Sequence, residues 1–375
     1  MRVLLLSKAL VSGQYQTKLT TLAAQKNLEL IVVVPPAWQD ERGRIVLEKR
    51  HTQGYELIVA PIRFNGHFHL HYYPTIKQIL TRAQPDIFHI DEEPYNYATF
   101  HAARASRQIN ARVKIIFFCW QNILRQYPFP FAQMEQYMYR AADAAIAGSG
   151  ESKNILQRKG FSKPVRVIPQ FGVPDAFAPR PTARAQNDFL IGYAGRLVPE
   201  KGVDVLLRAV ANLRGEWQLQ IVGSGPEKNS LAELAEALGI RARVTFTPWV
   251  SSGEMPNFFN SLDVLVVPSL TRANWKEQFG RVLMEAMACG IPVIGSASGE
   301  IPNVIGDAGI IVPENDADAI TRALETLRAN PALRQQYAQQ GRARVLQNFS
   351  ERRIAEDTYA LYQTLMQTSA PIAKH

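Results

Sequence analysis

Two carboxylates stand eight positions apart in the stretch Glu-Gln-Phe-Gly-Arg-Val-Leu-Met-Glu, at Glu277 and Glu285. The apolar run before it, Leu265-Val-Val-Pro-Ser269, predicts a buried strand, and the apolar positions from Val282 to Cys289 follow a helical period. Glu277 would then lie in the loop that leads into the helix, and Glu285 in the first turns of that helix. Unpaired amide groups and the dipole favour an anion at a helix N-terminus, so the stretch predicts a site for a charged, polyhydroxylated ligand such as a phosphate.

A pair of cations upstream could also bind a phosphate. Gly192-Tyr-Ala-Gly-Arg196 closes an expected strand, and Lys201-Gly202 opens the helix that follows. Arg196 and Lys201 would form a fixed cradle for a diphosphate around that helix N-terminus. The alternative is a tight turn with two solvated cations. Gly223-Ser-Gly-Pro226 ends another expected strand, but it lacks the Gly-Lys-Ser/Thr of a Walker loop and by itself indicates only a close approach to the backbone.

Strand-like and helix-like runs alternate from the first residue to about residue 315, which is typical of parallel sheets with crossover helices. This pattern predicts an α/β protein with two Rossmann-like halves. The proline-rich stretch between them is the expected linker, and three helices are expected at 316–328, 331–347 and 350–366. The expected strands are 2–7, 28–35, 56–60, 86–90, 112–119, 144–147 and 165–169 in the first half, and 189–194, 218–223, 244–248, 264–268, 292–296 and 309–312 in the second.

Composition narrows the functional classes. The chain has 375 residues, of which 46% are apolar, yet its apolar runs are far shorter than a membrane-spanning helix requires, and no signal-peptide cleavage site follows the first strand. A cytoplasmic protein is expected.

Residues 1–190 carry 24 Lys and Arg against 14 Asp and Glu, which would suit an anionic membrane face or a phosphorylated acceptor, although diffuse surface charge is the simpler interpretation. No nucleic-acid-binding module is present, and two cysteines imply neither a disulfide framework nor a zinc site.

Four motifs in register give a specific resemblance. They are Gly195-Arg196 with Lys201-Gly202, then Val222-Gly-Ser-Gly-Pro226, then Asp263-Val-Leu-Val-Val-Pro-Ser269, then Glu277 and Glu285 with Ala288-Cys-Gly-Ile-Pro-Val293 behind them. This order resembles the donor domain of the retaining glycosyltransferases of family 4, over roughly residues 189–366. In the first half, Val167-Ile-Pro-Gln-Phe-Gly-Val173 resembles the segment before that family's hinge.

The resemblance implies a GT-B fold: two Rossmann-like β/α/β domains facing each other across a cleft, with the C-terminal helices packing back toward the N-terminal domain. The implied divisions are an acceptor domain at 1–172, a linker at 173–188, a donor domain at 189–349 and a C-terminal helix at 350–375 that crosses back to the N-terminal domain.

Roles follow at the matching positions. Arg196 and Lys201 would bind the donor phosphates and stabilise charge on the departing nucleotide. Glu277 would hold hydroxyls of the transferred sugar, and Glu285 the ribose hydroxyls. The expected donor contacts also include the amides of Phe279 and Gly280, the side chains of Val282 and Leu283, and Gly13, Gly195, Gly223 and Arg281. No metal and no cofactor are expected, and the donor would be a UDP or GDP sugar.

The first half departs from the family pattern. A histidine commonly follows a strand in the family's N-terminal domain, but here Trp120-Gln-Asn122 follows the strand that ends at Cys119. Gln121 or Asn122 could bind sugar or acceptor hydroxyls, but neither can act as a base at neutral pH. Asp91-Glu-Glu-Pro94 follows another strand end, which makes Glu92 an acceptor-binding candidate, with a helix start as the alternative.

Histidines 67, 69 and 71 would share one face if their segment were extended. We assign this segment to acceptor binding rather than to a metal.

The sequence therefore predicts a retaining, metal-independent transferase that moves a sugar from a nucleotide-diphosphate donor to a saccharide or lipid-linked acceptor, in polysaccharide or glycoconjugate biosynthesis. It would be cytoplasmic, with peripheral contact at an anionic inner membrane face. The alternatives are a sugar-nucleotide epimerase or phosphorylase of the same fold, and a catalytically inactive sugar-nucleotide-binding protein.

Overall fold

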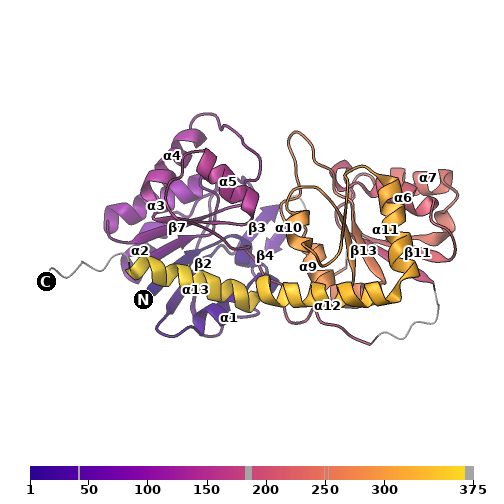
Figure 1. Cartoon of the computed structure of the whole chain (residues 1–375). Helices are drawn as coiled ribbons and strands as arrows, with labels where there is room; N and C mark the ends of the chain where they lie inside the picture. The colour runs from indigo at the N-terminus through magenta and orange to yellow at the C-terminus, as the bar shows by residue number, and fades with distance from the viewer. Residues whose placement is uncertain (41–42, 182–187, 249, 252, 368–375) are drawn as a thin grey trace. The chain divides into compact units, whose positions relative to one another are not determined.

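A computed structural model describes residues 1–40, 43–181, 188–248, 250–251 and 253–367 (Figure 1). The chain divides into two compact units. Unit 1 comprises Met1–Gly172 with the C-terminal stretch from Glu351, and unit 2 comprises Val173–Ser350. Each unit is built on its own parallel sheet.

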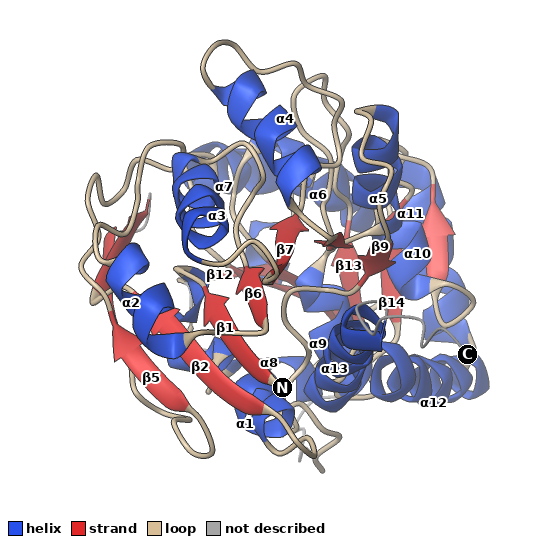
Figure 2. Cartoon of the chain, turned by 90° about the vertical axis from the view of Figure 1, so that its left-hand side faces the viewer, coloured by secondary structure: helices blue, strands red, loops and turns tan. Residues whose placement is uncertain are grey.

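Unit 1 contains a seven-stranded sheet in the order β5-β2-β1-β6-β7-β8-β9, and Figure 2 shows its first five strands side by side. The strands are β1 (Arg2–Leu6), β2 (Glu29–Val34), β5 (Glu56–Val59), β6 (Ile87–Ile90), β7 (Lys114–Cys119), β8 (Ala144–Ala147) and β9 (Val165–Val167). The helices are α1 (Thr17–Ala23), α2 (Ile76–Ala83), α3 (Tyr97–Ile109), α4 (Phe131–Ala141), α5 (Gly150–Arg158) and α13 (Glu351–Gln367). A small antiparallel hairpin, β3 (Ala37–Asp40) with β4 (Gly43–Val46), stands outside the sheet.

Helices cover both faces of this sheet, which explains why its strands are continuous apolar runs. On one face, α2 and α3 bury side chains such as Ile79 and Ala102 against β6 and β7. On the other, α1 and α13 pack against each other, and Leu361 of α13 is 2% exposed among β1 and β2 residues. Helix α13 is therefore part of the core of unit 1.

Unit 2 has a six-stranded sheet in the order β12-β11-β10-β13-β14-β15. The strands are β10 (Phe189–Ala194), β11 (Trp217–Val222), β12 (Val244–Thr247), β13 (Val264–Val267), β14 (Val293–Ser296) and β15 (Ile310–Val312). The helices are α6 (Val203–Ala211), α7 (Lys228–Ala237), α8 (Met255–Asn260), α9 (Arg281–Ala288), α10 (Ile301–Ile305), α11 (Ala317–Ala329) and α12 (Pro331–Asn348). In both sheets the chain order reverses at one place, between β1 and β6 in unit 1 and between β10 and β13 in unit 2. Such reversals are where open α/β sheets bind ligands.

All thirteen expected strands are present in the two sheets, with ends that differ by at most two residues. The β3–β4 hairpin was not expected. Of the C-terminal helices, only α13 packs in unit 1, whereas α12 packs on α9 in unit 2. Val173 and Phe177, in the range taken as a linker, are buried in the core of unit 2, and residues 182–187 lie outside the described part. None of the described helices has the length and apolar character to span a bilayer.

Candidate active site

The loops that follow β10 and β13 carry the donor motifs, and the reversal in strand order places these loops side by side. Lys201 ends the short 3-10 turn Pro199–Lys201, directly before α6. Glu277 lies in the loop between β13 and α9. The two side chains meet in an ion pair, with 2.5 Å between Lys201 Nζ and Glu277 Oε2. Residues 76 positions apart in the chain thus share one site.

Glu277 is held from several sides. The Ser269 hydroxyl, just after β13, donates to Oε2 of Glu277 at 2.9 Å. The Glu300 amide donates to the Glu277 carbonyl at 3.1 Å. Lys201 lies over the ring of Trp275, 4.8 Å from its centroid, so the ammonium is placed between an aromatic face and a carboxylate. These contacts fix a partly exposed cation beside a buried carboxylate.

The start of α9 supplies the second carboxylate. Gly280 precedes α9, and Glu285 sits in its second turn with Oε1 at 2.8 Å from Nε of Arg281. Burial raises the pKa of Glu285, and the neighbouring guanidinium of Arg281 opposes that rise. Val282 is half-buried, but Leu283 is 0% exposed and packs in the core of unit 2. The Leu283 side chain therefore supports α9 from inside and, in this structure, is closed to a ribose or base.

Phe279, beside Gly280, is partly buried, and its ring meets the Phe349 ring edge-on at 5.6 Å. This contact ties the start of α9 to the end of α12 within unit 2.

The loops after β10 and β11 are joined backbone to backbone. The Leu197 amide donates to the Ser224 carbonyl at 2.9 Å, and the Gly195 amide donates to the Val222 carbonyl at 3.0 Å. A Cβ at Gly223 would lie 1.9 Å from the Gly195 carbonyl oxygen, so this approach requires a glycine. Arg196 is exposed on the loop that these contacts hold. The glycine motifs thus serve to lock the loop that carries the cations.

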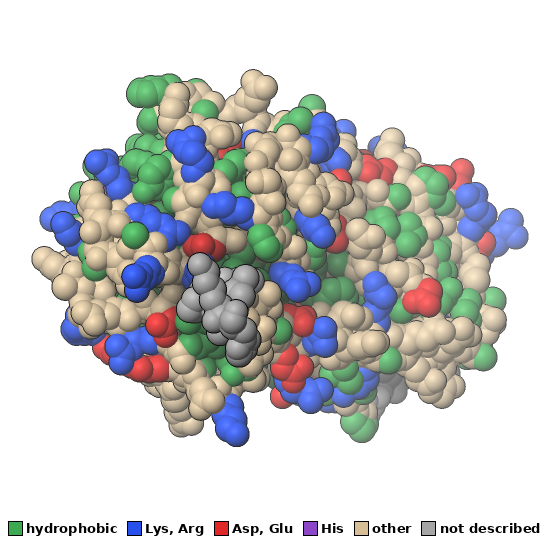
Figure 3. Space-filling model, turned by 60° about the vertical axis from the view of Figure 1, so that its left-hand side comes forward, with side chains coloured by type: hydrophobic (Ala, Val, Ile, Leu, Met, Phe, Trp, Pro, Cys, Tyr) green, Lys and Arg blue, Asp and Glu red, His purple; other side chains and the backbone are tan. Residues whose placement is uncertain are grey.

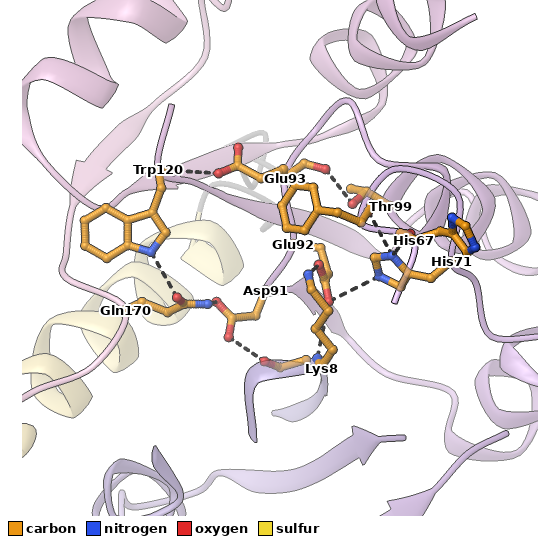
Figure 4. Close-up of polar contacts among 11 residues, drawn as sticks. Lys8, His67, His71, Asp91, Glu92, Glu93, Thr99, Trp120 and Gln170 are labelled. Carbon is orange, nitrogen blue, oxygen red and sulfur yellow. Dashed lines mark hydrogen bonds and ion pairs between the residues drawn. The ribbon is translucent and has the colours of Figure 1, made fainter. Parts of the chain in front are cut away.

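Unit 1 has a buried charged cluster at its own point of strand reversal (Figure 4). Lys8, which follows β1, pairs with Glu92, which follows β6, and its amide donates to Oε1 of Glu92 at 3.2 Å. His71 lies 3.7 Å from the same carboxylate. Burial would raise the pKa of Glu92, but Lys8 and His71 lower it to about 2. Glu92, the acceptor-binding candidate, is therefore already engaged by two side chains in this structure.

The flanking acids hold other elements. The Ser7 hydroxyl and the Gln170 amide donate to Asp91 at 2.8 and 3.0 Å, and the Trp120 indole donates to Gln170 at 3.0 Å (Figure 4). Glu93 accepts the backbone N–H of Trp120 at 2.8 Å through Oε1, while its buried Oε2 has no hydrogen-bond partner among the described residues. Burial raises the pKa of Glu93 to about 7, against the effect of that N–H donor.

The other first-half candidates are less open to a ligand than the sequence suggested. Gln121 and Asn122 are each 7% exposed, and Gln121 accepts from Lys159 at 3.3 Å. The Gly13 amide donates to Glu48 at 2.9 Å. The segment with the three histidines is a turn rather than a strand, with His71 buried while His67 and His69 are exposed. They therefore do not share one face, and within the described residues no three His, Cys, Asp or Glu side chains group as metal ligands would.

Comparison with known proteins identifies the family. Residues 175–344 match the model of the glycosyl transferases group 1, and residues 13–171 match that of glycosyltransferase family 4. The chain belongs to the group 1, family 4 glycosyltransferases. HepE of Anabaena, solved in complex with UDP and glucose, superposes with a TM-score of 0.70 at 18% identity, over 97% of this chain and 100% of that one. The two sheets are thus those of a GT-B glycosyltransferase.

Two curated relatives illustrate the range of this glycosyltransferase family. One is the GDP-mannose-dependent alpha-(1-6)-phosphatidylinositol monomannoside mannosyltransferase of Mycolicibacterium smegmatis, 38% identical over 42% of this chain and 45% of the relative. The other is the D-inositol 3-phosphate glycosyltransferase of Mycobacterium marinum, 32% identical over 52% of this chain and 44% of the relative. The matched part of the chain spans about half the length of these relatives.

Several residues of the two clusters were not singled out from the sequence. Ser269 and Trp275 hold Glu277 and Lys201, and Lys8 and Glu93 belong to the cluster in unit 1. Lys8 directly follows the buried run of the first strand, so the criterion that identified Glu92 would also have found it. Trp275 carries no such signal, because its role depends on how the loop after β13 turns back toward Lys201.

Proposed function

We propose that this protein transfers a sugar, with retention of configuration and without a metal, from a nucleotide-diphosphate donor to a saccharide or lipid-linked acceptor. The arrangement of Lys201, Glu277 and Ser269 in unit 2 carries the proposal. It supplies a cation for a phosphate beside a carboxylate for sugar hydroxyls. Glu285, next to the start of α9, suits ribose hydroxyls, because an ionised carboxylate accepts two hydrogen bonds.

The chemistry we assign to these groups is the stabilisation of a leaving nucleotide. As the bond from the sugar to the diphosphate breaks, negative charge grows on the phosphate oxygens. Lys201 and Arg196 would stabilise that charge more in the transition state than in the bound donor, as would the amides at the start of α9. Attack from the same face, assisted by the leaving phosphate, would retain the configuration. Two cations on the protein take the part that a divalent metal plays elsewhere.

The substrates are proposed from the relatives. The mannosyltransferase relative is GDP-mannose-dependent and HepE was solved with UDP, which supports a UDP or GDP sugar as donor. The relatives named for phosphatidylinositol monomannoside and inositol phosphate support a polyhydroxylated acceptor that carries phosphate or lipid. We assign the acceptor to unit 1, and we place the reaction in the cytoplasm, at the inner face of a membrane.

The test combines donor binding with turnover. In a thermal-shift panel of uridine, guanosine and adenosine diphosphates and their sugars, the cognate ligand at a hundredfold excess over its dissociation constant should stabilise the protein by about 2.7 kcal/mol. Glu277→Gln and Arg196→Ala should each lower transfer from that donor by about two to three powers of ten. Asp318→Asn, in the exposed first turn of α11, is the matched control and should turn over normally. Transfer near the wild-type rate in both site variants would refute the proposal.

One observation favours a second candidate, a sugar-nucleotide-binding protein without transferase activity. Trp120 stands where the family commonly has a histidine, and its indole is tied to Gln170. Such a protein would be stabilised by donor in the panel, yet it would release no nucleotide with any acceptor.

A further inference from the structure

Two loops of unit 1, residues 61–73 and 121–131, expose large hydrophobic side chains. Ten such side chains are strongly exposed among the described residues, and five lie on these two loops. Their exposures are 59% for Phe64, 41% for Phe68, 45% for Leu70, 47% for Leu124 and 80% for Phe129. We call this set the apolar rim. Scattered exposed apolar residues are ordinary, but a concentration on two adjoining loops marks an interaction surface.

The first loop is fixed in the shape that exposes these residues. Arg63 and Tyr72 exchange backbone hydrogen bonds of 2.9 and 3.2 Å across its base. Asn65 anchors it to β3, donating to the Ala37 carbonyl at 3.0 Å and accepting from the Gln39 amide at 2.9 Å. Phe64 has a φ of +53°, a conformation that bulky side chains rarely adopt. The fold thus accepts a strained backbone at a phenylalanine that it leaves in water.

The second loop is attached to the first by its rings. The Tyr127 ring stacks on that of Tyr95 at 4.1 Å, and His69 of the first loop lies 6.3 Å from Tyr127 and 5.3 Å from Phe131. Phe129 stands between two prolines and is the most exposed side chain of the apolar rim. The two loops that carry the apolar rim are therefore in contact with each other.

The charges around the apolar rim indicate the kind of surface that it binds. The two loops contain Arg63, Arg125 and three histidines, and not one Asp or Glu. Residues 1–172 as a whole carry 22 Lys and Arg against 12 Asp and Glu. The space-filling view shows Lys and Arg side chains spread over the visible face, together with Asp and Glu side chains and with hydrophobic side chains exposed among them (Figure 3). Phenylalanine and leucine within a cationic surface are suited to the boundary between anionic headgroups and acyl chains.

We propose that the apolar rim docks unit 1 onto an anionic phospholipid bilayer, with Phe64 and Phe129 entering the headgroup region. This deepens the proposed function and rests on it in one respect, since a lipid-linked acceptor would be presented at that surface. Burial of the two exposed rings supplies the apolar part of the binding. The excess of cations supplies an electrostatic attraction to the anionic headgroups, and salt weakens this attraction.

The test is cosedimentation of the full chain with vesicles of phosphatidylcholine alone, and of phosphatidylcholine with about a third phosphatidylglycerol to supply the negative surface potential. We expect the wild type to bind the anionic vesicles more tightly, and salt to weaken that binding. Phe129→Asp and Phe64→Asp should each lower the partition coefficient by roughly tenfold or more, because each replaces a ring that would leave water with a charge that the anionic surface repels. Leu346→Asp is the matched control, since Leu346 is 45% exposed on α12 in unit 2, and it should bind as the wild type does.

Nucleotide-induced thermal stabilisation, measured on the same preparations, keeps the inference separate from the proposed function. We expect the rim variants to be stabilised by nucleotide as the wild type is, and this result would also show that they fold. Absence of wild-type binding to the anionic vesicles would overturn the inference, as would equal binding by the rim variants and the wild type. A change of oligomeric state in Phe129→Asp with unchanged vesicle binding would also overturn it, in favour of a second copy of this chain as the partner. Failure of every nucleotide to stabilise the wild type would count against the proposed function instead.

Discussion

At the scale of single residues, the side chains around each charged group in the two clusters determine whether that group is paired and ionised. Glu277 is buried and pairs with Lys201, which is partly exposed, whereas Glu92 is kept ionised by two side chains, Lys8 and His71. Glu93 is the exception. Its burial outweighs the N–H of Trp120, the Cys119 thiol and the more distant charge of Lys8, so it retains its proton at a pH where other carboxyls have lost theirs.

This difference gives a pH-dependent prediction for Glu93→Gln. The pKa of Glu93 is about 7 in the folded protein, against the ordinary value of 4.5. Between these values the folded protein holds a proton that the unfolded chain has released, so the free energy of unfolding falls as pH rises from 4.5 to about 7. Glutamine avoids that loss, and Glu93→Gln should be more stable than the wild type at pH 8 by as much as about 3 kcal/mol, but not at pH 5.

Urea unfolding at the two pH values measures the difference. Glu56→Gln, whose carboxylate is 53% exposed on the edge strand β5, serves as the control for loss of a charge. The same difference between Glu93→Gln and wild type at both pH values would contradict the burial of an ionisable Glu93.

Sequence singled out individual candidate residues but not the contacts that surround them. Glu277, Lys201 and Glu285 were found because fixed motifs follow buried strands. The cluster of Lys8, His71 and Glu92 depends on three segments that only the folded sheet and its loops bring together. No local pattern encodes such a meeting.

At the scale of elements, buried strands were easy to predict and the exposed hairpin was not. A parallel strand covered on both faces reads as a continuous apolar run, as the central strands β1 and β13 do. Strands β3 and β4 read Ala-Trp-Gln-Asp and Gly-Arg-Ile-Val, and of these eight residues only Ala37 and Trp38 are buried. Their role as an anchor for the loop at 61–73 follows from contacts made by Asn65.

The close approach of the loops after β10 and β11 is an element-scale property that one methyl group should disrupt. In Gly223→Ala, the new Cβ would overlap the Gly195 carbonyl and push the loop that carries Arg196 out of place. We expect transfer to fall by on the order of a hundredfold, as displacement of a positioned group by about 1 Å can cost that much.

Donor affinity and turnover of Gly223→Ala, measured together, check this expectation. Gly253→Ala is the control, because among the described residues the Ser251 side chain, at 4.0 Å, is the nearest group to its Cβ position. Unchanged turnover in Gly223→Ala would show that the loop carries its cations without the backbone lock.

At the scale of the whole molecule, the chain forms two units, each with its own core, and unit 1 is built from two stretches of the chain that flank unit 2 in the sequence. Unit 1 begins the chain and also takes its last described helix. The chain enters unit 2 at Val173 and leaves it at Ser350, and these two residues form a β-bridge with each other. Each unit should therefore respond to changes in its own core.

Leu361→Ala in α13 tests this independence. Leu361 is 2% exposed in the core of unit 1, and its truncation should cost about 2–5 kcal/mol of stability through the cavity that it leaves. Nucleotide binding, which we assign to unit 2, should keep its dissociation constant in isothermal titration at a temperature where the variant is folded. Equal loss of nucleotide affinity and stability would mean that the two cores do not act independently.

The place of α13 also sets an order for biosynthesis. A ribosome completes every strand of unit 2 before it makes residues 351–367, and domains generally fold as units during synthesis. Unit 2 can therefore fold on the nascent chain, while the faces of α1, β1 and β2 that α13 covers stay open until the last helix is released. Unit 1, although translated first, is the later of the two to be finished.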